Sequence, residues 1–143
     1  MIVNAEVKFP VIQQTPNFIL GSIKDPSQLL TVGEQNLKKG CFKNCRIVDS
    51  CGNEFRVISA RKSKTEKLFR LWNLFPSYRL IKVDIELSES IKLDFDIFKE
   101  QVLSTMKSKK WVRSLDETEE EILLYLNKVT SFEDFICRVG VYS

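Results

Sequence analysis

Four cysteines carry the most nucleophilic side chains of this chain. Cys41, Cys45 and Cys51 lie within eleven residues, and Cys137 follows near the C-terminal end. Because the chain has no histidine, a zinc site would need all four thiolates or additional carboxylates. The spacing contains no C-x2-C pair, so we expect no metal or other cofactor and interpret these residues as reduced, buried or half-buried thiols. A reactive thiol needs exposure beside a positive charge, and Cys45 next to Arg46 is the candidate.

The absence of histidine excludes several classes of enzyme. Ser–His–Asp and Cys–His catalysis and HExxH metalloprotease sites all require an imidazole. The remaining candidates for acid–base chemistry are Asp84 and Glu86, which alternate with apolar residues and should lie close together on one exposed strand face. A solvated face is the simpler interpretation of this pair. We therefore predict a protein that is not an enzyme and has no catalytic residues.

The charge of the chain is unevenly distributed, although its net charge is only +3. Residues 38–82 contain twelve lysines and arginines and three acidic residues, whereas residues 83–143 contain eight basic and thirteen acidic residues. Such asymmetry is typical of a charged binding face. Within the basic part, residues 56–70 combine arginine and lysine with neighbouring aromatic residues, as in many protein interfaces.

Partner binding is therefore the function that the residues favour. The candidate partner-binding residues are Arg56, Arg61, Lys62, Arg70, Trp72, Asp84 and Glu86. A nucleic-acid-binding module that uses residues 56–70 is the alternative, because basic side chains displace counterions and flat rings stack on bases. No apolar run is long enough to span a bilayer and no signal peptide is recognisable, so we expect a cytoplasmic protein without a membrane partner.

One stretch in the middle of the chain predicts a β-hairpin at residues 46–60. The β-rich runs Arg46–Asp49 and Glu54–Ala60 flank Ser50–Asn53, a turn that contains glycine and asparagine. In the second run Phe55 and Val57 should lie on the buried face, and Glu54 and Arg56 on the exposed face. Leu80–Leu87 alternates in the same way and predicts a half-buried antiparallel strand.

The N-terminal third predicts short elements. A strand should end near Phe9 because Pro10 limits its continuation, residues 13–17 should be a polar connector, and residues 18–23 form a second short strand candidate. Asp25 followed by Pro26 predicts the start of one short helix, and the capping box Thr31-x-x-Glu34 predicts the start of another.

The last third predicts helices. Apolar residues recur with helical spacing from Phe95 to Met106, and capping boxes at Ser114 and Ser131 predict the starts of two further helices. Residues 68–75 fit either a short helix or a covering loop. Strands followed by helices predict an α+β fold in one domain, residues 1–143, with an antiparallel sheet of about four to five strands and C-terminal helices packed on one face. The central hairpin 46–60 and the strand 80–87 would form the middle of that sheet.

Three segments carry a resemblance to a known group of proteins. They are Val7–Val11, the hairpin residues from Ile47 to Lys62, and Ile81–Leu87 with the helix that follows it at 95–106. In these segments the chain resembles small bacterial immunity proteins of polymorphic-toxin or contact-dependent growth inhibition systems. The resemblance implies a non-enzymatic, cytoplasmic protein that binds a cognate toxin domain and blocks its active site or the access of its substrate. Immunity proteins against nucleases are often acidic, so the basic middle of this chain disfavours a nuclease partner unless the acidic C-terminal helices form the contact.

Overall fold

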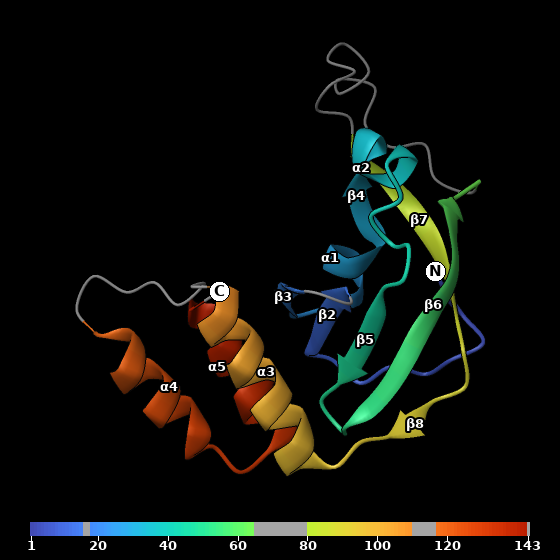
Figure 1. Ribbon diagram of the computed structural model, residues 1–143. Helices are drawn as coiled ribbons and strands as arrows, with labels where there is room; N and C mark the ends of the chain where they lie inside the picture. The colour runs from blue at the N-terminus through green and yellow to red at the C-terminus, as the bar shows by residue number, and fades with distance from the viewer. Residues whose placement is uncertain (16–17, 65–79, 110–116, 143) are drawn as a thin grey trace.

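The computed structural model describes residues 1–15, 18–64, 80–109 and 117–142 of the chain (Figure 1). It confirms the predicted mixed α+β fold with helices at the C-terminal end. Within the described residues the sheet has eight strands, more than the predicted four to five. The additional strands are short, of two to three residues, and they lengthen the edges of a sheet whose centre was predicted.

The elements follow one another along the chain with strands first and long helices last. The strands are β1 (Ile2–Val3), β2 (Val11–Thr15), β3 (Phe18–Ile23), β4 (Thr31–Gly33), β5 (Arg46–Asp49), β6 (Asn53–Lys62), β7 (Leu80–Leu87) and β8 (Ile91–Lys92). The helices are α1 (Pro26–Leu30), α2 (Glu34–Lys38), α3 (Phe95–Lys109), α4 (Glu119–Asn127) and α5 (Phe132–Tyr142).

The sheet is ordered β1-β7-β6-β5-β2-β3, with β4 also paired to β7 and β8 paired to β6. The predicted hairpin is confirmed as β5 and β6, in which Ile47 lies opposite Phe55. The predicted strand Leu80–Leu87 is confirmed as β7 with the same bounds. All pairs are antiparallel except β1 with β7, so the sheet is mixed at that edge.

The N-terminal strand was predicted too long: it is confined to β1, and the prediction that it ends near Phe9 was wrong. The chain from residue 4 to residue 10 is irregular, and β2 begins directly after Pro10 and extends into residues 13–15 of the segment predicted as a polar connector. Proline costs a strand nothing when it precedes the first ladder position, because no ladder bond needs its missing N–H. Val11 and Ile12 are both fully buried between the layers, which places β2 inside the sheet despite its two glutamines.

Two helix starts differ from the predicted ones. Thr31 belongs to β4 and pairs with Lys82 of β7, and α2 begins three residues later behind Gly33 without a side-chain cap. Pairing with β7 satisfies the backbone groups of Thr31 better than a cap would. The helix expected from Ser114 begins at Glu119, where Thr118 and Glu121 form the capping box. The predicted caps Asp25 and Ser131 are confirmed, and each accepts a backbone N–H of its helix at 2.9 and 3.2 Å.

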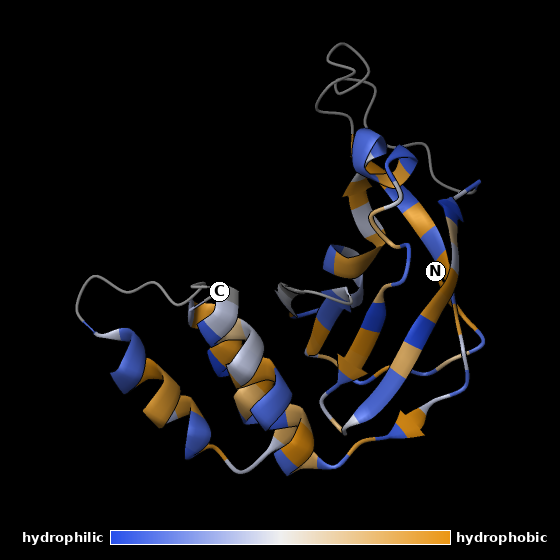
Figure 2. Ribbon diagram, viewed as in Figure 1, coloured by the Kyte–Doolittle hydropathy of each residue, from blue (hydrophilic) through white to orange (hydrophobic). Residues whose placement is uncertain are grey.

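Two hydrophobic cores lie on opposite faces of the sheet. Ile12 and Val48 face the C-terminal helices and pack with buried residues of α3, α4 and α5, such as Phe98 and Phe135. Alternate residues of the same strands face the other core, which α1 covers through Leu29. Figure 2 shows the alternating hydrophilic and hydrophobic bands along β6 and β7 that result. The prediction that the C-terminal helices pack on one face is confirmed.

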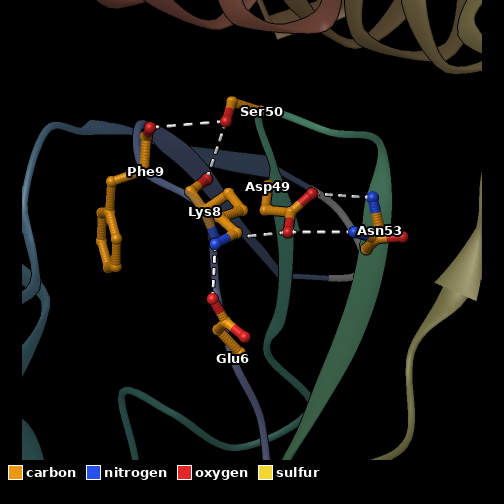
Figure 3. Close-up of polar contacts among 6 residues, drawn as sticks. All are labelled: Glu6, Lys8, Phe9, Asp49, Ser50 and Asn53. Carbon is orange, nitrogen blue, oxygen red and sulfur yellow. Dashed lines mark hydrogen bonds and ion pairs between the residues drawn. The ribbon is translucent and has the colours of Figure 1, made fainter.

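The buried carboxylate of Asp49 organises the turn of the hairpin (Figure 3). Its oxygens accept the backbone N–H groups of Cys51 at 3.0 Å, Asn53 at 2.9 Å and Lys8 at 3.3 Å, and the side-chain amide of Asn53 at 3.2 Å. Ser50 adds its hydroxyl to the carbonyl of Lys8 at 3.0 Å. Charge-assisted bonds of this kind are about twice as strong as neutral ones. They fix both the turn and the N-terminal segment that crosses it.

Gly52 connects this turn to the C-terminal helices. Its φ is +83°, and a Cβ at this position would lie 2.4–2.9 Å from three ring carbons of Phe132 in α5. Only a residue without a side chain allows α5 to approach the turn so closely.

We predict that Gly52→Ala destabilises the protein by about 2–4 kcal/mol, because it adds a steric clash with Phe132 to the strain of a left-handed alanine. The matched control is Gly40→Ala, whose φ is +78° but whose Cβ would lie an ordinary 3.6 Å from Lys43. This control should lose only about 1–2 kcal/mol. Urea unfolding measures both values, and equal losses in the two variants would contradict the role given to Phe132.

Candidate functional site

Four of the seven predicted partner-binding residues lie on one face of β6 and β7. Arg61 lies opposite Asp84 in the register of the two strands, and Glu86 lies two residues further along β7. The buried residues of β7 alternate with these carboxylates and face the core. Arg56 of β6 lies on the same face, because its neighbour Phe55 points into the core on the α1 side and the bulge between Val57 and Ser59 offsets the alternation between Arg56 and Arg61. We call Arg56, Arg61, Asp84 and Glu86 the outer face.

The remaining predicted residues do not join the outer face. Lys62 lies opposite Val83 on the core side of the sheet, and its ammonium group is 3.9 Å from Glu34 of α2. Arg70 and Trp72 lie outside the described residues, as does most of the aromatic stretch 68–75.

Both carboxylates of the outer face hold neighbouring segments of the chain. Asp84 Oδ1 accepts a hydrogen bond from the amino group of Met1 at 3.1 Å. Glu86 accepts one from the hydroxyl group of Ser59 at 3.1 Å and one from the side-chain amide of Asn4 at 3.4 Å. These contacts attach β6 and the N-terminal segment to β7, which favours a structural role for the pair over acid–base chemistry.

The arginines of the hairpin are differently paired. Arg46 and Arg56 lie directly opposite each other on β5 and β6, an arrangement of like charges that destabilises a sheet unless a counter-charge is present. Glu54 supplies that charge to Arg46, with Nη1 and Oε2 3.1 Å apart. Within the described ranges no ion pair or side-chain hydrogen bond involves the guanidinium group of Arg56, which is exposed. The positive charge of Arg56 is therefore available to a partner.

The burial of Glu54 corrects a sequence-based prediction. Alternation predicted it on the exposed face beside Arg56, yet only 8% of Glu54 is exposed. The reason is non-local, since Glu54 lies opposite Val48, on the face of the sheet that the C-terminal helices cover. A carboxylate in such a position requires a partner, and Arg46 provides it.

A pocket of about 460 Å³ opens at the start of β5. Its lining residues are Asn44, Cys45, Arg46, Glu54, Arg56 and Val57. Guanidinium groups bind carboxylates and phosphates through paired hydrogen bonds, so this pocket suits an anionic group of a partner.

Sequence reasoning missed three polar residues of this pocket, Asn44, Arg46 and Glu54. The signal was present for Arg46, because a short hairpin turn fixes the register and so places Arg46 opposite Arg56. Glu54 lies on the face covered by the C-terminal helices, and no local pattern reveals that cover.

The thiols divide into two classes. Cys45 is buried, with 2% of its surface exposed, and burial raises the pKa of its thiol above the ordinary value. Desolvation likewise raises the pKa of the half-buried Cys41. Cys51 and Cys137 are exposed, so the interpretation of the cysteines as buried or half-buried thiols was wrong for these two. The interpretation of Cys45 as a thiol activated by Arg46 is therefore wrong, because its desolvation opposes formation of the thiolate.

We predict that a thiol reagent at pH 8 modifies Cys51 and Cys137 at least about tenfold faster than Cys45 in the folded protein, since only thiolates react and Cys45 is both inaccessible and less acidic. Timed alkylation followed by peptide mass spectrometry measures each rate. In urea the rates should become similar. A Cys45 that reacts first in the folded protein would contradict this assignment.

Comparison with known proteins gives no indication of function, so the function is argued from the arrangement of the residues. No protein-family model matches the chain, and neither a curated protein nor a solved structure is significantly similar to it. Across the described ranges, no helix combines the length and apolar character needed to cross a membrane. In the same residues, no three cysteine, aspartate or glutamate side chains gather in a way that could hold a metal ion.

Proposed function

We propose that this protein is a non-enzymatic, cytoplasmic binding protein that neutralises a cognate toxin domain, and that Arg56 is the centre of its contact with that domain. One observation carries the proposal: Arg56 is an exposed arginine beside a pocket, and its cross-strand neighbour Arg46 already has Glu54 as a partner. An acidic group of the toxin would give Arg56 the counter-charge that Arg46 already possesses.

The physical properties of this position suit a protein interface. Arginine is enriched among the residues that contribute most to protein–protein binding, especially at the edge of a pocket that excludes water. Arg46 and Arg56 lie on the paired strands β5 and β6, so their side chains are held by rigid strands rather than by a loop. Preorganised groups lose less conformational entropy when they bind.

The identification of the partner as a toxin has a separate support. It rests on the resemblance of the hairpin, of the strand Ile81–Leu87 and of the following helix to immunity proteins. The proposal would require the gene of this protein to lie beside a gene for its toxin.

Nucleic-acid binding is the second candidate, because Arg56, Arg61 and Lys64 are all exposed in or directly after one strand. Affinity for nucleic acid would fall steeply with salt, since each phosphate contact releases a counterion. A protein partner held by one desolvated arginine would show a weaker dependence on salt.

We predict that co-expression with the product of the neighbouring toxin gene restores growth, and that Arg56→Glu weakens binding of that toxin by about 30-fold, or roughly 2 kcal/mol, as expected for a central arginine. Growth rescue and calorimetric titration of the purified pair measure the two effects. Lys24→Glu is the matched control, because it makes the same change of charge at an exposed lysine outside the hairpin.

Two outcomes would contradict this account. The absence of growth rescue by the unaltered protein would exclude neutralisation. Equal losses of affinity in Arg56→Glu and Lys24→Glu would mean that net charge, and not the position of Arg56, controls binding.

A further inference from the structure

Strand β6 is longer than its neighbour β5, and this difference leaves part of one edge of β6 without a partner among the described strands. Residues 54–56 pair with β5, and the N–H of Val57 donates to the carbonyl of Cys45 at 2.9 Å. Beyond that point, none of the described strands pairs with this edge of β6. Figure 1 shows β6 continuing past the start of β5 while the preceding chain turns away toward α2.

The turn that uncovers the edge is encoded in the sequence. Gly40 and Asn44 both have positive φ, +78° and +55°, a conformation that glycine adopts freely and asparagine tolerates. They direct the chain from α2 into β5, whose contact with β6 begins where Cys45 accepts the N–H of Val57. The chain therefore joins the edge late, and none of the described strands pairs with the second half of β6 on this side.

Hydrogen bonding identifies the groups that point outward from this edge. The N–H of Ser63 donates to the carbonyl of Lys82 at 2.9 Å, so Ser63 faces β7. Because backbone groups alternate in direction along a strand, Arg61 also faces β7, whereas Ala60 and Lys62 face away from it. The N–H of Ile85, opposite Ala60, donates to Met1 on the far side of β7, which agrees with this assignment.

The side chains along the edge are basic and partly apolar. Arg61 and Lys64 are exposed, and Ile58 is 61% exposed at the bulge in β6. Positive charges on an open edge discourage a second copy of the same edge from pairing with it. The same charges attract a strand that carries carboxylates.

We propose that the edge of β6 at residues 58–62 binds an extended, acidic segment of a partner protein as an additional antiparallel strand. This inference deepens the proposed function, because it rests on a protein partner and names the part of that partner that docks. The N–H and C=O groups of Ala60 and Lys62 would form the backbone bonds, and Arg61 would pair with a carboxylate of the added strand.

The position of the pocket supports this mode of binding. An antiparallel strand on the edge would continue the line of β5 and run toward Asn44. The pocket that Asn44 lines also contains Arg46 and Arg56. A carboxylate at the end of the added strand would thus reach Arg56, the arginine that lacks an acidic partner within the described residues.

The test uses the full chain, labelled with ¹⁵N, and an end-blocked peptide of about eight alternating glutamates and valines. On titration, the amide signals of Ala60 and Lys62 should shift more than those of Arg61 and Ser63. A peptide with lysine in place of glutamate should not bind. N-methylation removes a backbone hydrogen-bond donor. The glutamate peptide methylated on the alternate nitrogens that would face Ala60 and Lys62 should therefore no longer bind.

Two variants complete the experiment. Ala60→Pro removes an outward N–H that forms no ladder bond, and it should weaken peptide binding at least about tenfold. Arg61→Glu leaves the backbone unchanged and should weaken binding by a similar factor, so a folding defect of the proline variant would not decide the result. Lys24→Glu should bind the peptide as the unaltered chain does.

Several results would overturn the inference. They are the absence of amide shifts at about 1 mM glutamate peptide, shifts located away from residues 58–62, and equal binding of the lysine peptide. Binding of single-stranded oligothymidylate at the edge with no response to the peptide would identify a nucleic-acid surface instead. If the protein neutralises the toxin but does not bind the peptide, only the proposed binding at the edge of β6 is refuted. If it binds the peptide but does not neutralise the toxin, only the proposed toxin-directed function is refuted.

Discussion

The structure depends most on the buried carboxylate of Asp49. A charged group with no exposed surface is tolerable only when hydrogen bonds replace its hydration, and Asp49 accepts four. Three of the four come from its own hairpin turn and one from Lys8, more than forty positions earlier in the sequence. Asp49 therefore fixes the turn between β5 and β6 and attaches the N-terminal segment to it.

The properties of the candidate interface follow from this fixed turn. The turn determines which residues of β5 and β6 oppose each other, and so it brings Arg46 and Arg56 together. It also presents Gly52 to Phe132, which joins the hairpin to the C-terminal helices. From the turn, β6 extends for ten residues and β5 for four, so the unequal lengths produce the open edge. Stability and the proposed binding thus share one local structure.

Sequence reasoning identified the elements whose patterns are local. The hairpin and β7 alternate in hydropathy, and their bounds were predicted almost to the residue. It failed where distant segments decide the outcome. The second half of β2 was predicted as a polar connector because the burial of this strand by both layers is invisible in Gln13 and Gln14. Thr31 was predicted as a helix cap because its pairing with β7 is non-local.

The candidate site shows the same division. Alternation along β7 predicted that Asp84 and Glu86 share a face, and they do. Arg56 and Arg61 join that face only because the bulge between Val57 and Ser59 offsets the alternation of β6, which no local pattern reveals. Alternation along β6 also misplaced Glu54, because the C-terminal helices cover the face that it shares with Val48. The adjacent Arg46 suggested an activated thiol at Cys45, but burial raises the pKa of that thiol instead. The proposed binding depends on the backbone of β6 rather than on Glu54 or Cys45. Amide hydrogen exchange of the free, full chain tests the edge of β6 most directly. The amides of Ala60 and Lys62 should exchange rapidly while those of Arg61 and Ser63 are protected; equal protection of all four would show that the edge is covered and would contradict the account.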